Sequence, residues 1–193
     1  MTGAHDHPRS WRSAAPISTR RLLLREPEFG DVSRIARHLA EPSVASMLAS
    51  IPSPFTEAHA SVLVGDLLTS NERGDALALA IARRRDPGTL MGLISFSKSG
   101  SAAEIGWWLG PRYWGRGFAS EAAVAMIEVA FRDESLDRLS AGVFADNPAS
   151  LRMQTRLGFR SSGQGRRFCV ARAALTDHIN MVLTREDHLA AAR

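Results

Sequence analysis

The hydrophobic pattern changes its period near the middle of the chain, and this change restricts the possible folds most. Leu77, Leu79 and Ile81 alternate with alanines, and a period of two predicts a β-strand. Two further strand patterns, at 89–97 and 103–109, follow after short turns. We therefore expect three consecutive strands in an antiparallel meander. Beyond them the pattern becomes strand, glycine loop and helix, which predicts a mixed α+β domain.

Helical and strand patterns on either side of the meander complete this prediction. Before it, a strand is expected at 21–26 and a helix at 28–40. Residues 41–55 contain three prolines and are expected to form a loop with a short helical turn. Thr56 can cap a second helix. After the meander we expect helices at 117–131 and 148–157, and strands at 138–144, 159–162 and 178–183.

Composition excludes several classes of protein. A chain of 193 residues is long enough for one compact domain. Its single cysteine, Cys169, excludes an intramolecular disulfide and a cysteine-based structural zinc site. The net charge of +4 would permit a nucleic-acid partner. However, Lys98 is the only lysine among 24 basic residues and alanines are abundant, so the basic balance reflects coding composition most simply.

The first 18 residues are expected to form a flexible leader, and residues 19–193 the folded domain. The leader lacks the apolar stretch of about 7–15 residues that a secretory signal needs, so we expect a cytoplasmic protein. His5 and His7 are expected to be solvated, and no metal site is predicted. The apolar run at 122–131 is too short to cross a bilayer, so no membrane partner is expected.

The segment 112–121, Arg-Tyr-Trp-Gly-Arg-Gly-Phe-Ala-Ser-Glu, is the candidate binding loop. Gly115 and Gly117 allow a sharp turn that exposes consecutive amides at a helix start, an anion site suited to a pyrophosphate. A Walker loop would need Lys and Ser or Thr after Gly117, and a dinucleotide fingerprint would need Gly or Ala where Ser120 stands. Coenzyme A is the third possible ligand, and a plain turn into a helix is the remaining alternative.

Four motifs in one order resemble the GNAT (Gcn5-related) N-acetyltransferase superfamily. They are Glu104-Ile-Gly-Trp-Trp-Leu109, Arg112-x-x-Gly115-x-Gly117, Asn147-Pro-Ala-Ser150 and Leu157-Gly-Phe159. The segments 19–25 and 177–187 resemble the RimJ/RimL-type branch, which includes acetyltransferases of ribosomal-protein N-termini. The resemblance covers about residues 19–187. It implies the GNAT fold, an α+β architecture with a mixed, mostly antiparallel sheet of six or seven strands flanked by about four helices.

The same resemblance implies acetyl-CoA as the acyl donor and a primary amine as the acceptor, with direct attack in a ternary complex. The acceptor would be a protein N-terminal α-amine or a small amine. The strand that ends at Leu109 should diverge from the strand at 138–144, so that the pantetheine arm can pair with its backbone. The residues expected at the cofactor are Trp107, Trp108, Leu109, Arg112, Gly115, Arg116, Gly117, Phe118, Ala119, Ser120, Asn147 and Ser150.

Two catalytic residues are predicted from the resemblance. Glu104 is the candidate general base, with a solvent-facing strand carboxylate as its alternative. Many relatives carry a tyrosine acid where this chain has Gln154, and the only tyrosine, Tyr113, lies in the glycine loop. Ser150 is the remaining hydroxyl on that helix that the resemblance places near the thioester sulfur, and we expect it to donate a hydrogen bond to that sulfur.

Two other side chains near these motifs have structural interpretations. Asn147 precedes Pro148, so it can cap a helix as well as approach the cofactor arm. Glu121 is expected to complement the helix dipole rather than to act as a base.

Other classes of function remain open at this level. A catalytically silent CoA-binding sensor would keep the loop, although the presence of Glu104 argues against it, and a basic nucleic-acid-binding module is the less favoured alternative. A homodimer is compatible with the sequence. The segments 41–55 and 166–172 should determine the acceptor, but neither carries a readable code.

Overall fold

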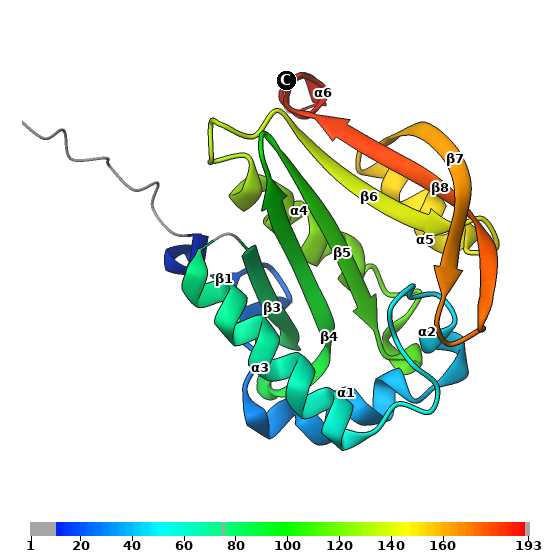
Figure 1. The fold of residues 1–193 in the computed structure, drawn as a ribbon. Helices are drawn as coiled ribbons and strands as arrows, with labels where there is room; N and C mark the ends of the chain where they lie inside the picture. The colour runs from blue at the N-terminus through cyan, green and yellow to red at the C-terminus, as the bar shows by residue number, and fades with distance from the viewer. Residues whose placement is uncertain (1–10, 75, 192–193) are drawn as a thin grey trace, which may run out of the picture.

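The computed structural model describes residues 11–74 and 76–191, and the strands in them form one eight-stranded sheet (Figure 1). The strand order is β1-β2-β3-β4-β5-β6-β8-β7. Neighbouring strands are antiparallel except β5 and β6, which are parallel. The α+β architecture and the meander β3-β4-β5 are therefore confirmed, with eight strands in place of the six or seven expected.

The bounds of the elements agree with most of the expected ranges. The strands are β1 (Ile17–Ser18), β2 (Leu22–Arg25), β3 (Ala76–Arg83), β4 (Asp86–Ser99), β5 (Ala102–Leu109), β6 (Arg138–Phe144), β7 (Arg160–Cys169) and β8 (Ala174–Thr184). The α-helices are α1 (Val32–Leu39), α2 (Pro42–Ala45), α3 (Glu57–Arg73), α4 (Phe118–Ala130), α5 (Pro148–Arg156) and α6 (Arg185–Ala191). Three short 3-10 helices are η1 (Trp11–Ala14), η2 (Phe29–Asp31) and η3 (Pro111–Tyr113).

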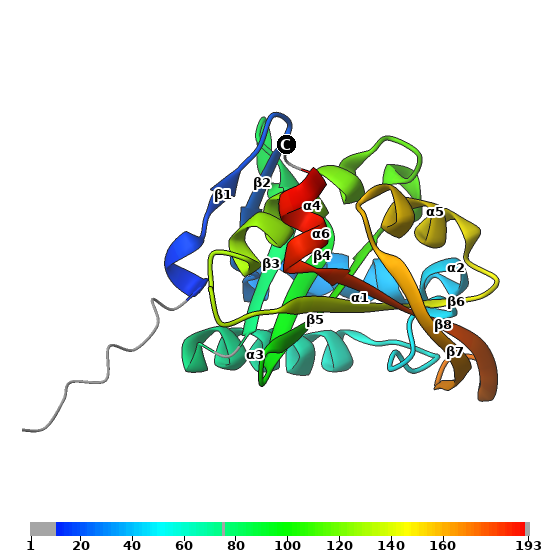
Figure 2. The ribbon, with the colours of Figure 1, turned by 90° about the horizontal axis from the view of Figure 1, so that it is seen from above.

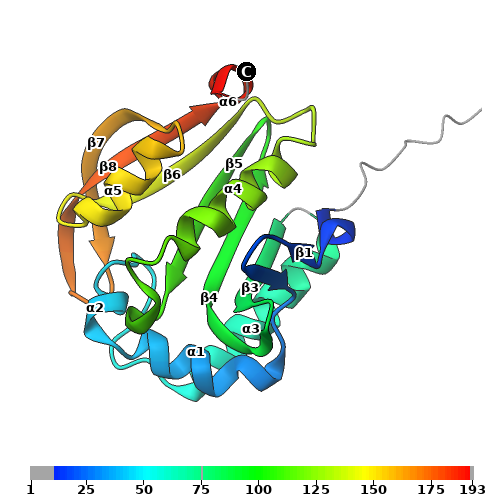
Figure 3. The ribbon, with the colours of Figure 1, turned by 180° about the vertical axis from the view of Figure 1, so that it is seen from behind.

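Helices cover both faces of the sheet. Helices α4 and α5 lie on one face, and α1 and α3 lie on the other (Figure 2 and Figure 3). Thr56 caps α3 as predicted, because its hydroxyl accepts a hydrogen bond from the amide of His59. A larger core cluster packs between the sheet and α4, and a smaller one packs beneath α1, α2 and α3. No helix in residues 11–74 and 76–191 is long and apolar enough to cross a membrane.

Residues 11–18 are the described part of the expected leader, and they contain two short elements. They form η1 and β1, and the ring of Trp11 is buried edge-on against Phe96 with 4.7 Å between ring centroids. One tryptophan in a polar segment has no periodicity, so its burial depends on a surface that only the folded sheet provides. The rest of the expected leader, including His5 and His7, lies outside the described residues.

The strands β5 and β6 separate soon after they begin. They pair only between Ala102–Glu104 and Arg138–Ser140. Beyond Glu104, β5 stays beside β4 as far as Leu109, whereas β6 stays beside β8. The predicted divergence of these two strands is therefore confirmed, and it leaves facing backbone edges that pair with no strand in the part of the chain described.

Candidate functional site

The glycine loop turns sharply between η3 and α4. Gly115 and Gly117 have φ angles of +70° and +73°, in the left-handed region that favours glycine. Gly117 is the N-cap of α4, and no side chain among the described residues caps that helix. Since the first amides of an α-helix have no acceptor within the helix, these amides and the positive helix end are suited to bind an anion.

Arg21 and Glu121 hold the loop from behind. The carboxylate of Glu121 accepts hydrogen bonds from the hydroxyl of Thr19 at 2.6 Å, the amide of Arg21 at 2.7 Å and Nε of Arg21 at 2.5 Å. Nη1 of Arg21 donates to the carbonyl of Arg116 at 2.9 Å. Burial would raise the pKa of Glu121, but these hydrogen bonds outweigh it and hold the pKa below its ordinary value. Glu121 therefore acts as a structural hydrogen-bond acceptor. Thr19 and Arg21, which lie just before β2, hold the glycine loop in place through it.

A cavity of about 570 Å³ begins at this loop and follows the gap between β5 and β6. It contains ten of the twelve residues expected at the cofactor: Trp107, Trp108, Leu109, Gly115, Gly117, Phe118, Ala119, Ser120, Asn147 and Ser150. Arg112 and Arg116 do not line it, although both belong to the adjoining loop. Arg152 and Arg156, one turn apart on α5, line it and were not predicted. Their spacing of four residues, on the helix that Asn147 caps, is the sequence feature that could have predicted them.

The wall formed by α5 has an unpaired polar atom. Asn147 caps α5 as predicted, with its side-chain oxygen 3.0 Å from the amide of Ser150. Gln154 is only 2% exposed, and its Nε2 donates to the hydroxyl oxygen of Ser150 at 3.2 Å. Its Oε1 has no partner among the described residues. An unpaired buried acceptor costs about 1–3 kcal/mol. The wall therefore favours a ligand that can donate a hydrogen bond to this Oε1.

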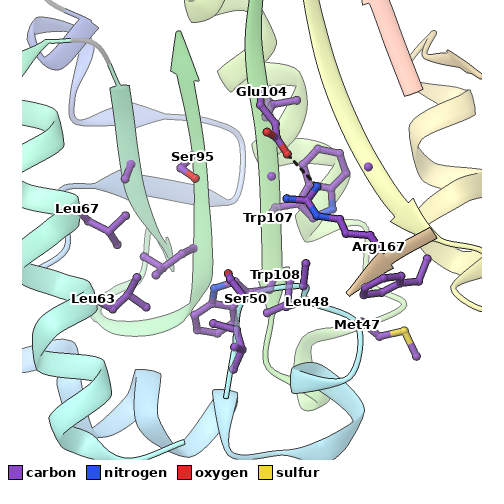
Figure 4. Close-up of a pocket in the computed structure, with 18 of the residues that line it drawn as sticks. Met47, Leu48, Ser50, Leu63, Leu67, Ser95, Glu104, Trp107, Trp108 and Arg167 are labelled. Carbon is purple, nitrogen blue, oxygen red and sulfur yellow. Dashed lines mark ion pairs between the residues drawn. The ribbon is translucent and has the colours of Figure 1, made fainter. Parts of the chain in front are cut away.

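A second cavity of about 300 Å³ lies in front of β5 (Figure 4). It shares Trp107, Trp108, Met47 and Leu48 with the first cavity. Glu104 lines this second cavity, and its Oε1 lies 3.6 Å from Nη1 of Arg167 on β7. The predicted base therefore lines one cavity, most of the predicted cofactor residues line the other, and Trp107 and Trp108 line both.

His178 of β8 lines the second cavity and is paired with Phe144 of β6. Its ring is 8% exposed, and Nδ1 lies 3.1 Å from Oδ1 of Asn180. A Cβ atom on Gly142 would overlap this ring, so β6 carries a glycine where the histidine packs. Burial and then the charge of Arg167 lower the pKa of His178 below its ordinary value. The ring is consequently neutral near pH 7.

The tip of the β7–β8 hairpin holds the segment 46–50 over the second cavity. Arg172 donates from Nε to the carbonyl of Ser46 at 2.7 Å and from Nη1 to Asp146 at 2.7 Å. These hydrogen bonds hold the pKa of Asp146 below its ordinary value. The amide of Val170 donates to the carbonyl of Ala49 at 2.9 Å. The sequence pointed to both segments but could not show that they contact one another.

Arg172→Ala should loosen this wall. Loss of the hydrogen bonds to Ser46 and Asp146 is expected to cost about 1–2 kcal/mol, a value reduced for partial exposure. The midpoint of thermal unfolding should fall by about 2–8 °C, and a molecule in the second cavity should lose more affinity than one in the first. Thermal unfolding and steady-state kinetics measure both effects. Arg160→Ala, which removes an exposed ion pair to Asp187 at the other end of β7, is the control and should change neither.

Comparison with known proteins decides the family. A sequence model of the acetyltransferase (GNAT) domain matches residues 21–160. This chain belongs to the GNAT acetyltransferase family. It is an N-acetyltransferase that depends on acetyl-CoA, in agreement with the prediction. The resemblance noted in the four sequence motifs is thereby confirmed.

Relatives of this GNAT acetyltransferase span nearly its whole folded part. It is 33% identical over 149 residues to the uncharacterised N-acetyltransferase YnaD of Bacillus subtilis (strain 168), covering 76% of this chain and 84% of that one. A GNAT-family acetyltransferase from Bacillus anthracis has a TM-score of 0.75 and 25% identity, over 88% of this chain and 98% of that one. RimJ from Mycobacterium smegmatis, solved with CoA-disulfide, has a TM-score of 0.75 and 20% identity, over 89% and 90%. RimJ therefore shares the fold.

Proposed function

We propose that this GNAT acetyltransferase transfers the acetyl group of acetyl-CoA directly to a primary amine, either the α-amine of a protein N-terminus or the amine of a small molecule. The observation that carries the proposal is the pair of cavities that meet at β5. Trp107 and Trp108 line both of them. A donor in the first cavity and an acceptor in the second would therefore come together at these residues, as a ternary complex requires.

The first cavity would bind the donor along its length. The free amides at the start of α4 would hold the pyrophosphate, with Arg112, Arg116, Arg152 and Arg156 adding positive charge at the same end. The unpaired edge of β5 would accept the pantetheine arm as an added strand does. The orphan Oε1 of Gln154 would accept a hydrogen bond from an amide of that arm.

The second cavity would prepare the acceptor. Glu104 would remove a proton from the incoming ammonium, because an amine attacks only through its free lone pair. A backbone amide of Trp108 or Leu109 would donate to the carbonyl oxygen as negative charge develops there. The proposal thus assigns proton transfer to a side chain and charge stabilisation to the main chain.

Ser150→Ala should have a moderate effect. Gln154 donates to the hydroxyl oxygen of Ser150, which leaves the hydroxyl hydrogen free to point at the thioester sulfur. Removal of this donor is expected to cost about 1–3 kcal/mol of transition-state stabilisation. Gln154→Ala should cost less. The kinetics of both variants with one acceptor test this, and a collapse of turnover in Ser150→Ala with normal acetyl-CoA affinity would instead identify Ser150 as an essential acid.

A screen of amines and N-terminal peptides for CoA release tests the proposed function. We expect release that depends on an amine, with formation of the acetylated product detected by mass spectrometry. Binding of acetyl-CoA without release for any amine would contradict the proposal and would identify a silent CoA-binding sensor. The cytoplasmic location, the domain boundary at residue 19 and a homodimer stay predictions.

A further inference from the structure

The second cavity has one negative and one positive side chain on the same wall. Among the described residues that line it, Glu104 is the only acid and Arg167 is the only arginine or lysine. The two side chains point toward one another from β5 and β7 (Figure 4). His178, the remaining titratable group in the lining, adds no charge near pH 7. The charges of this cavity therefore balance, which does not suit a polycationic acceptor.

The opposite wall of the same cavity is apolar. Leu63 and Leu67 of α3 lie on the side of the cavity away from Arg167, and Trp108 and Leu48 also line it (Figure 4). Ile51 and Leu93 also line the cavity, and Ser50 and Ser95 add two hydroxyl groups to it. A volume of about 300 Å³ lies at the lower end of the range of ligand pockets. The space therefore suits a small molecule with an apolar side chain.

The ion pair between Glu104 and Arg167 contributes little to the fold. Its side chains are 59% and 50% exposed, and its 3.6 Å separation is longer than a hydrogen bond. Water screens exposed pairs of this kind, and many contribute nothing measurable to stability. This ion pair can therefore break when a ligand binds, and each of its two side chains can then pair with the opposite charge of the ligand. A guanidinium in addition binds a carboxylate through two parallel hydrogen bonds.

We propose that the acceptor is a zwitterion with an apolar side chain, that is, a free α-amino acid of about the size of leucine or methionine. Its ammonium group would pair with Glu104, its carboxylate with Arg167, and its side chain would lie among the leucines. The proposal rests on the proposed function. The amine nitrogen forms a bond to the acetyl carbon as the carbon–sulfur bond breaks, one ammonium proton passes to Glu104, and another ends on the departing sulfur.

A comparison of carboxylate and amide tests this inference. Leucine and leucinamide share one side chain and differ in the group that Arg167 would bind. Because the amide also lowers the pKa of the neighbouring amine, kcat/KM is compared per free amine, and it should be about 10–100-fold higher for leucine. In Arg167→Gln the leucine-to-leucinamide ratio should fall to near 1. Arg166→Gln is the matched control, because Arg166 is the next residue on β7, does not line the cavity and pairs instead with Asp177. It should keep the ratio.

The other possible outcomes would overturn either the proposal on the acceptor or the proposed function. A ratio near 1 in the unsubstituted protein, an unchanged ratio in Arg167→Gln, or a clear preference for a Leu-Gly-Gly peptide would overturn the proposal of a free amino acid and leave the proposed function intact. Preference for a polyamine such as spermidine would do the same. If acetyl-CoA binds and no amine in the panel releases CoA, the proposed function itself fails. Because Arg167 is half-exposed, the variant is expected to fold, which thermal unfolding checks.

Discussion

Gly117→Val should raise the dissociation constant of acetyl-CoA by about 100-fold or more. Gly117 has a φ angle of +73°, where a β-branched residue costs about 1–3 kcal/mol of strain. Relief of that strain would turn the first amides of α4 away from the anion site. An added Cβ would also lie 3.3 Å from Nη2 of Arg21, and Arg21 is the side chain that fixes the carbonyl of Arg116. Titration calorimetry on the folded variant measures the change.

A second glycine supplies a matched control. Gly100 has a φ angle of +63° in the turn between β4 and β5, and nothing lies within 4 Å of a Cβ there. Gly100→Val therefore introduces similar backbone strain far from the loop. It should lower the midpoint of thermal unfolding and leave acetyl-CoA affinity unchanged. If Gly117→Val binds acetyl-CoA as well as Gly100→Val does, the loop is not the pyrophosphate site.

Local patterns predicted the parts of the molecule that short-range physics determines. The turn at Gly115 and Gly117, the cap formed by Asn147, and the meander are each set by residues close in sequence, and all three are confirmed. The divergence of β5 and β6 came from the family resemblance. No local signal marks it, because it depends on how β6 pairs with β8.

Contacts between distant segments could not be predicted in the same way. Arg21 reaches the carbonyl of Arg116, and Arg172 reaches that of Ser46, but nothing in either arginine's neighbourhood identifies its partner. Strand β7 was predicted only in its first residues. All but the last of its residues are exposed, so the strand has no alternation of buried and exposed positions to detect. Arg167, which gives the second cavity its positive charge, lies in the part of β7 that was not predicted.

Glu104→Gln should lower turnover by about 10²–10⁴-fold and leave acetyl-CoA affinity unchanged. That range is typical for removal of a positioned proton-transfer group. Glu104 does not line the cavity proposed for acetyl-CoA, so binding there should not change. The half-exposed pair with Arg167 is weak, so the substitution should not unfold the protein. Steady-state kinetics with a saturating acceptor, beside calorimetry with acetyl-CoA, separates turnover from binding.

The pH dependence and a matched acid distinguish proton transfer from simple attraction of the acceptor. If Glu104 is the base, kcat should fall even at saturating acceptor, and higher pH should restore part of it because more of the amine then arrives deprotonated. If Glu104 only attracts the ammonium, KM should rise and kcat should stay near its original value. Glu128→Gln, at an exposed position of α4 that lines neither cavity, should change neither constant. A small loss of kcat in Glu104→Gln with an unchanged pH profile would mean that another group, or solvent, accepts the proton.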